Sequence, residues 1–266
     1  MAREIKLSAQ EHMLHGDTLL EKWEFAQSVG FDGIELLGGG GGKFKARLPE
    51  LKAATAAGVP IETVCVAMDH FLGDFDADRR RSAIAGIKEL ISVMVEIGGW
   101  GAITPAAFGL FSRALPPFTP PRSDEETHEH VLTGLTELGE HAAREGGVVL
   151  LEPLNRFEDY MVNTLADGVG YCKEIGLDSV RVIGDFFHMN IEELDLVASV
   201  RDAAPYIAHM QLGDSSRLEP GSGHVDFAGP IDALAEAGYT GWYAMECGLS
   251  GDPADVLPRV STLLRG

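Results

Sequence analysis

The sequence has few basic residues for its length. Its 266 residues include 21 Lys and Arg against 41 Asp and Glu, which gives a formal net charge of −20. A chain with this charge is repelled by the phosphate backbones of nucleic acids and by anionic lipid headgroups. We therefore expect neither a nucleic acid nor a membrane surface as a partner.

Cysteines and long apolar runs are also scarce. Cys65, Cys172 and Cys247 show no paired spacing, so we expect free thiols in a reducing compartment. The N-terminal residues MAREIKLSAQ lack the apolar core of a signal peptide. The most apolar stretch, 89–111, is interrupted by Glu96 and by several glycines, which argues against a membrane span. The sequence therefore predicts a cytoplasmic protein.

Two nucleotide-binding motifs are absent after the first predicted strand. Neither G-x-G-x-x-G nor G-x-x-x-x-G-K-[ST] occurs there, which disfavours a doubly wound open sheet built around a nucleotide. The glycine run at 38–42 could cradle a phosphate, but no helix-opening Lys, Ser or Thr signature accompanies it. We therefore interpret this run as a loop.

Two kinds of segment alternate along the whole chain. Amphipathic stretches rich in Ala, Glu and Leu have the period of a helix, and short apolar runs have the character of strands. The predicted strands are residues 4–8, 33–37, 61–67, 100–104, 148–153, 180–185, 207–212 and 242–247. The predicted helices are residues 18–29, 44–58, 77–97, 123–145, 164–175, 191–205, 230–238 and 253–265.

The pattern predicts one α/β domain. Continuous apolar runs such as VVLL are typical of parallel strands that helices cover on the outside. The segments SVGFDGIELLG (28–38) and EAGYTGWYAMECG (236–248) echo each other, as expected of a repeated strand–helix unit. No low-complexity linker divides the chain. We therefore predict a single (β/α)8 TIM barrel over residues 1–266, with its active site at the C-terminal ends of the strands.

Polar side chains end four consecutive predicted strands. Glu152, Asp185, Gln211 and Glu246 follow one another at intervals of 33, 26 and 35 residues. A strand–helix unit takes about 30 residues, so each of these positions advances by one unit. The four side chains are therefore expected to meet at one height in the mouth of the barrel, although any one acid at a strand end could instead cap a helix or form a surface ion pair.

Three acids at one mouth call for compensation. Carboxylates that lie close together raise each other's pKa and destabilise the fold. A divalent cation would relieve this, and an oxygen-rich ligand set favours Mg²⁺ or Mn²⁺. Gln211 would supply its carbonyl oxygen. His209, two residues earlier on the same face, is interpreted as a buried histidine that orients a ligand, and Glu35 as a structural residue.

The segments LEPLNRFED, GDFFHMNIEE, HMQLGDSSRLEPGSGHVDF and GYTGWYAMEC resemble the xylose isomerase-like TIM-barrel superfamily. Within it, the similarity is to the ketose 3-epimerases and to hydroxypyruvate isomerase, and it is strongest over 148–248. The resemblance implies a Mn²⁺, Mg²⁺ or Co²⁺ ion held by Glu152, Asp185, Gln211 and Glu246. The ketose 3-epimerases have His where Gln211 stands, whereas the hydroxypyruvate isomerase branch has Gln.

The resemblance also implies roles in the reaction. Glu158, His188 and Arg217 would contact the substrate. Glu152 and Glu246 would remove and return a proton next to a carbonyl, through an enediolate that the metal stabilises. Return to the opposite face of the same carbon gives epimerisation, and return to the neighbouring carbon gives isomerisation. The substrate is expected to be an uncharged ketose or keto-sugar, because Arg217 is the one convincing cation near the mouth.

Other functions remain open at this point. The same site could act as a metal-dependent lyase or deglycosidase that opens 3-keto glycosides by β-elimination, usually with a second small subunit. A nuclease would need a His-rich site and a basic groove, and a sugar-binding module would not need both Glu152 and Glu246. The sequence reveals no interface, so a homo-oligomer and a second subunit are both left open.

Overall fold

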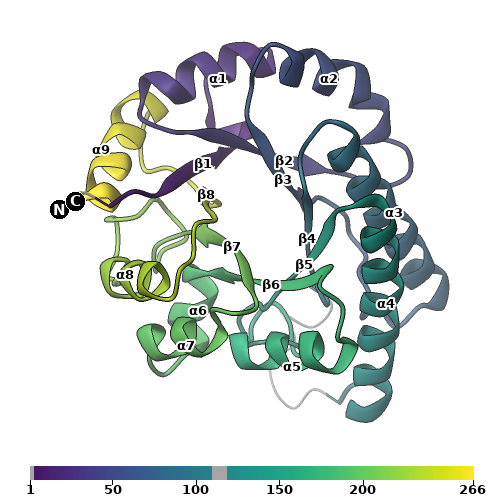
Figure 1. Cartoon of the computed structure of the whole chain (residues 1–266). Coiled ribbons are helices and arrows are strands. Elements are labelled where there is room, and N and C mark those ends of the chain that lie inside the picture. Colours follow the sequence, from purple (N-terminus) through teal and green to yellow (C-terminus); the bar gives the residue numbers. More distant parts are fainter. Residues whose placement is uncertain (1–2, 110–118) are drawn as a thin grey trace.

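The computed structural model describes residues 3–109 and 119–266 of the chain. Eight parallel strands close into one barrel in sequence order, and β8 pairs with β1. Figure 1 shows this closed ring of strands with the helices outside it. The predicted (β/α)8 TIM barrel is confirmed. The strands are β1 Lys6–Gln10, β2 Gly33–Gly38, β3 Ile61–Val66, β4 Gly101–Pro105, β5 Val148–Glu152, β6 Val180–Asp185, β7 Ile207–Leu212 and β8 Trp242–Met245.

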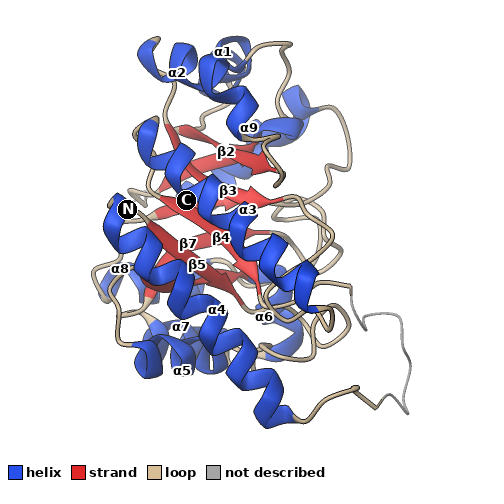
Figure 2. Cartoon of the chain, turned by 90° about the vertical axis from the view of Figure 1, so that its right-hand side faces the viewer, coloured by secondary structure: helices blue, strands red, loops and turns tan. Residues whose placement is uncertain are grey.

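Helices follow the strands and cover the barrel from outside, as the side view in Figure 2 shows. The two termini lie side by side in Figure 1, where the backbone N–H of Arg3 donates to the carbonyl oxygen of Arg265 at 2.7 Å. The helices of the described ranges are α1 Leu19–Ser28, α2 Leu48–Ala56, α3 Ala77–Glu96, α4 Asp124–Glu145, α5 Leu165–Ile175, α6 Phe186–Glu192, α7 Leu196–Ala203, α8 Ala228–Glu236 and α9 Pro253–Arg265, with short 3-10 turns η1 Glu11–Met13 and η2 Lys45–Arg47.

The strands are buried on both faces, as their continuous apolar sequences predict. In β5, Val149 and Leu151 belong to the large core shared with the helices, whereas Leu150 belongs to a separate small cluster that includes Ile183 of β6. Successive side chains of a strand point to opposite faces. Leu150 therefore shares its inner face with Glu152, the last residue of β5, and the small cluster forms the floor beneath the strand ends.

The helix boundaries follow local capping. Helix α4 begins after Ser123, whose hydroxyl accepts the N–H of Glu126 while the Glu126 carboxylate accepts the N–H of Ser123. This reciprocal arrangement satisfies two N–H groups that would otherwise lack partners. The helix ends at Gly146, which has a φ of 85° and so adopts the left-handed conformation that glycine tolerates.

Two predicted elements are wrong in detail. The single helix predicted at 191–205 is two helices, α6 and α7, with a short break between them. Asp195 is the last residue of this break and caps the N-terminus of α7. Helix α6 begins directly after β6, because the Asp185 carboxylate accepts the N–H of Phe187 and so starts a helical turn. The first strand lies at Lys6–Gln10 instead of 4–8, which brings Gln10 to the strand end.

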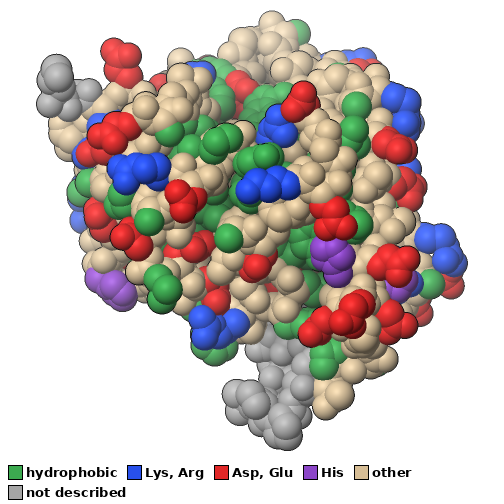
Figure 3. Space-filling view, turned by 60° about the horizontal axis from the view of Figure 1, so that its bottom comes forward, with side chains coloured by type: hydrophobic (Ala, Val, Ile, Leu, Met, Phe, Trp, Pro, Cys, Tyr) green, Lys and Arg blue, Asp and Glu red, His purple; other side chains and the backbone are tan. Residues whose placement is uncertain are grey.

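The described residues contain no helix that is both long enough and apolar enough to cross a membrane. On the face drawn in Figure 3, Lys and Arg side chains are separated by acidic and uncharged ones and do not merge into a continuous basic surface.

Candidate active site

The four predicted strand-end residues lie at the same end of the barrel. Glu152 and Asp185 are the last residues of β5 and β6, and Asp185 is the register partner of Gln211 in β7. Glu246 follows the last residue of β8, and its backbone N–H donates to Leu212 of β7 at 3.1 Å. The regular repeat of strand and helix therefore does place these four positions around one mouth.

A cavity of about 300 Å³ opens at this mouth. Five of the predicted site residues form the polar part of its lining, whereas the rest is mostly apolar and comes from the ends of β3 and β4 and from segments that follow β3, β4 and β5. The polar part consists of Glu152, Glu158, His188, Arg217 and Glu246. The rest of the lining is Cys65, Val66, Ala67, Met68, Phe71, Pro105, Phe108 and Leu154.

Arg217 connects two of the acids. Its guanidinium donates to Oδ2 of Asp185 and to Oε2 of Glu246, each at 2.6 Å. Among the described residues, Arg217 is the one non-glycine residue with a positive φ, at 55°. The loop that carries it is organised by Asp214, whose carboxylate accepts the N–H groups of Ser215, Gly221 and Val225. This loop therefore holds Arg217 in an uncommon backbone conformation that aims it at the acids.

The acids perturb one another. Burial raises the pKa of Glu246 to about 7, although Arg217 opposes the rise. Burial, followed by the charges of Glu246 and Asp185, raises the pKa of Glu152 well above its usual range. Burial also acts to raise the pKa of Asp185, but Arg217 and His188 together outweigh it and the pKa is lowered. Arg217 therefore favours the ionised form of Asp185, whereas burial favours the protonated form of Glu246.

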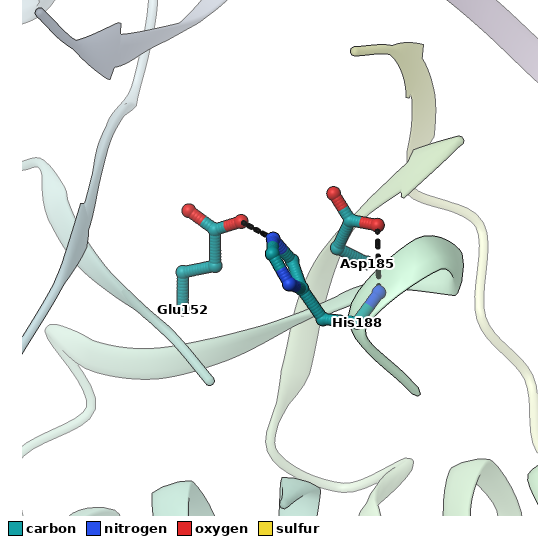
Figure 4. A group of neighbouring side chains, drawn as sticks. All are labelled: Glu152, Asp185 and His188. Carbon is teal, nitrogen blue, oxygen red and sulfur yellow. Dashed lines mark hydrogen bonds and ion pairs between the residues drawn. The ribbon is translucent and has the colours of Figure 1, made fainter. Parts of the chain in front are cut away.

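His188 lies close to Glu152 and Asp185, and Figure 4 draws the three side chains together. They offer one ligand atom each, all within 4.8 Å of one another. Burial lowers the pKa of His188 to about 4, so the ring is neutral at neutral pH. Its Nδ1 accepts the backbone N–H of Asn155 at 3.1 Å. The proton of a neutral ring therefore sits on Nε2, which lies 3.7 Å from Oε1 of Glu152.

The donor set fits a divalent cation. Oε1 of Gln211 is buried and has no hydrogen-bond partner among the described residues. Buried carbonyl oxygens normally have a partner, and a cation would provide one. The same cation would counter the burial and the repulsion that raise the pKa of Glu152 and Glu246. His188 fits less well as a ligand, because its Nε2 carries the proton and its Nδ1 already accepts a hydrogen bond.

A second layer of polar residues lies beneath these groups, and the sequence did not reveal its role. Glu35 of β2 is fully buried and bonds to Gln211 and His209. His209, interpreted from sequence as orienting a ligand, thus contacts Glu35 directly. Gln10 donates to Glu246 at 3.1 Å, and the thiol of Cys65 donates to it at 3.4 Å. A signal was present, since Glu35 is an acid in the middle of an apolar strand.

The comparison with protein families identifies the class of protein. The model of the family described as xylose isomerase-like TIM barrel matches residues 23–264. The chain belongs to this family, and the resemblance inferred from the sequence is confirmed.

Relatives with assigned activities are sugar epimerases. The 3-dehydro-D-guloside 4-epimerase of Escherichia coli K12 is 38% identical over 243 residues, which cover 91% of this chain and 92% of that protein. The L-ribulose 3-epimerase of Mesorhizobium japonicum is 33% identical over 174 residues, which cover 63% of this chain and 56% of that protein. Because a relative that aligns along nearly the whole chain is an epimerase, the chain is an enzyme, as predicted.

Solved structures agree with this. The crystal structure of 3-keto-D-glucoside 4-epimerase from Escherichia coli, in its apo form, superposes with a TM-score of 0.91 at 37% identity and covers 98% of this chain and 99% of its own. A structure of L-ribulose 3-epimerase superposes with a TM-score of 0.83 at 22% identity, covering 98% of this chain and 93% of its own. The second likeness concerns the fold alone.

Proposed function

We propose that the protein is a divalent-metal-dependent epimerase of a keto-sugar, which moves a proton at a carbon next to a carbonyl group. The observation that carries the proposal is that Glu152 and Glu246, from strands β5 and β8, line one cavity together with Arg217 and His188. Two carboxylates that face one bound sugar from different strands can remove and return a proton on different faces of the same carbon.

The ion would be held by Glu152, Asp185, Gln211 and Glu246, with Mn²⁺ or Mg²⁺ suited to these oxygen ligands and Co²⁺ as a further candidate. When bound, such an ion supplies positive charge next to the carbonyl and hydroxyl oxygens of the sugar and so makes the neighbouring C–H proton more acidic. The unpartnered oxygen of Gln211 supports this ligand set.

The other polar residues of the cavity bind and orient the sugar in this proposal. His188 carries its proton on Nε2, so it donates a hydrogen bond into the cavity. Asn155 donates to Oε2 of Glu158 at 2.9 Å, which holds that carboxylate as an acceptor for a sugar hydroxyl. Arg217 is the one cation in the lining of the cavity among the described residues, so a phosphorylated sugar would lack partners for its charge.

The relatives favour a substrate class. Two that align along nearly the whole chain at 38% and 37% identity are named as 4-epimerases of glycosides with a keto or dehydro function at carbon 3. Carbon 4 is adjacent to carbon 3, so the proton that moves in those proteins is the one next to the carbonyl. We infer that this chain acts on a 3-keto glycoside. A free ketose is the second candidate, since other relatives are named as ketose 3-epimerases.

The test is solvent exchange. The Mn²⁺-loaded protein is incubated in D₂O with a methyl 3-keto-glucoside and, separately, with D-psicose and L-ribulose, and products are followed by NMR. Deuterium at carbon 4 of the glycoside together with its 4-epimer is the expected result. Release of the aglycone would instead establish β-elimination, the lyase alternative. Absence of exchange with every sugar in the metal-loaded protein would refute the proposal.

A further inference from the structure

Glu35 lies at the centre of the polar layer beneath the cavity. Its side chain is 0% exposed. Oε1 accepts hydrogen bonds from Nε2 of Gln10 at 3.1 Å and from Nε2 of Gln211 at 2.9 Å. Oε2 accepts from the hydroxyl of Thr63 and from Nε2 of His209, each at 2.8 Å. Four donors from the three strands β1, β3 and β7 therefore fill the roughly four acceptor positions of one carboxylate.

This carboxylate decides which end of the Gln211 amide faces it. An ionised carboxylate can only accept hydrogen bonds, so the NH₂ group of Gln211 must point toward Glu35. The carbonyl oxygen must then point away, and this is the buried oxygen without a partner among the described residues. A rotated amide would set the oxygen of Gln211 against an oxygen of Glu35 and would lose the 2.9 Å hydrogen bond.

The same carboxylate is connected to Glu246. Nε2 of Gln10 donates to Oε1 of Glu35 and to Oε1 of Glu246, both at 3.1 Å. One amide group therefore links the buried acid to the proposed base. Glu35 thus holds two members of the proposed ligand set from below, one directly and one through Gln10.

We propose that Glu35 is a positioning residue that presents the carbonyl oxygen of Gln211 to the metal and requires a neutral side chain at position 211. A carboxylate at position 211 would lie against the carboxylate of Glu35 with no hydrogen atom between them. The repulsion of these two buried charges would destabilise the folded protein. The inference rests on the proposed function, because it concerns a ligand of the proposed ion. It assigns Glu35 a role in selecting a ligand, beyond supporting the fold.

A double-mutant cycle tests the inference. Mn²⁺ affinity is measured by calorimetry for the wild type, Glu35→Gln, Gln211→Glu and the double variant, each checked for folding by circular dichroism. Residues that orient metal ligands typically change affinity about 10- to 100-fold. Gln211→Glu should weaken Mn²⁺ binding by at least about 10-fold in the wild-type background and by less than about 3-fold in the Glu35→Gln background, where an amide can donate to the new carboxylate.

Thr63→Val is the matched control. It removes one donor from Oε2 of Glu35 and leaves the bond to Gln211 in place, so Mn²⁺ affinity should stay within about 3-fold of the wild type. Unfolding midpoints without metal give a second readout. Gln211→Glu should lower the midpoint more in the wild-type background than in the Glu35→Gln background. If the single variant Gln211→Glu fails to fold and the double variant folds, that result would also support the inference.

The outcomes separate two kinds of failure. Equal effects of Gln211→Glu in both backgrounds, on affinity and on midpoint, would overturn the role of Glu35 and leave the proposed function intact. A wild-type protein that binds no Mn²⁺, Mg²⁺ or Co²⁺ would refute the metal-dependent function and this inference together, and the wild-type titration alone reveals that case.

Discussion

The guanidinium of Arg217 donates a hydrogen bond of 2.6 Å to Oε2 of Glu246, the proposed base. Its other terminal nitrogen reaches Asp185 at the same distance. One cation therefore joins the acids at the ends of β6 and β8. Since burial raises the pKa of Glu246 to about 7 while Arg217 opposes the rise, this contact keeps the carboxylate available for proton transfer near neutral pH.

Glu246→Gln should abolish turnover and leave the fold intact. The amide has nearly the shape of the acid but cannot take up a proton, so the rate of deuterium exchange into the sugar should fall at least about 100-fold. The unfolding midpoint should not fall, because the change removes a buried acid with a raised pKa. Glu236→Gln, the same change at an exposed position of α8, is the control and should keep full activity. Retained exchange in Glu246→Gln would remove Glu246 from the proton-transfer pair.

Arg217→Lys should impair catalysis although the charge is kept. An ammonium group lacks the planar fork with which the guanidinium bonds Asp185 and Glu246 together. We expect kcat/KM for the sugar to fall at least about 10-fold, measured by steady-state kinetics with NMR detection. Arg201→Lys on the exposed surface of α7 serves as the control. Equal kcat/KM for the two variants would show that the fork has no role.

Gln211→His should retain metal binding with an altered preference. An imidazole nitrogen favours Co²⁺ and Zn²⁺ over Mn²⁺ more strongly than an amide oxygen does. The affinity for Co²⁺ relative to Mn²⁺ should therefore rise, as measured by calorimetry for each ion. Gln27→His, which adds a histidine on the surface of α1, controls for unspecific binding. Complete loss of metal in Gln211→His would contradict the proposed ligand set.

Asp159→Asn should change how stability depends on pH. Burial raises the pKa of Asp159 from 3.8 to about 7, so the folded protein keeps this proton between pH 4 and 7 while the unfolded chain releases it. The contribution of Asp159 to stability therefore falls as pH rises through this window and levels off above it. At about 1.4 kcal/mol per pKa unit, the fall is at most about 4 kcal/mol.

The asparagine does not titrate, so the unfolding midpoint of the variant minus that of the wild type should rise from pH 4 to 7. The carboxylate accepts the backbone N–H groups of Ala107 and Met161, and the variant loses one of these bonds, which adds a cost of about 1 kcal/mol that does not change with pH. Asp178→Asn, at an exposed position, should give a flat difference. A flat difference for Asp159→Asn as well would show that Asp159 is ionised throughout.

The barrel could be predicted from sequence because its repeat is regular. One apolar run and one amphipathic segment recur about every 30 residues, and this spacing placed Glu152, Asp185, Gln211 and Glu246 at consecutive strand ends before the fold was known. The short helix α6 escaped prediction, because the predicted strand ended at residue 185 and the next predicted helix began only at residue 191. The Asp185 side chain starts the helix by accepting backbone N–H groups of its first turn. Such a cap can start a helix even where the residues that follow, here two phenylalanines, also suit a strand.

The layer beneath the cavity could not be predicted, because it depends on contacts between residues far apart in sequence. Glu35 and Gln211 lie 176 positions apart, and Gln10 and Glu246 lie 236 positions apart. A buried acid on an apolar strand indicates that it has hydrogen-bond partners, but the sequence does not show which residues they are. The predicted end of the first strand at residue 8 also left Gln10 outside the strand.

The pairing of β8 with β1 has a consequence for biosynthesis. Glu246 follows β8, and Gln10, which bonds to it, ends β1. During translation β1 leaves the ribosome long before β8 is made, since synthesis proceeds at about 5 to 20 residues per second. The cavity can therefore be completed only after β8 and Glu246 have been synthesised, and a shorter nascent chain lacks one of the two proposed acids.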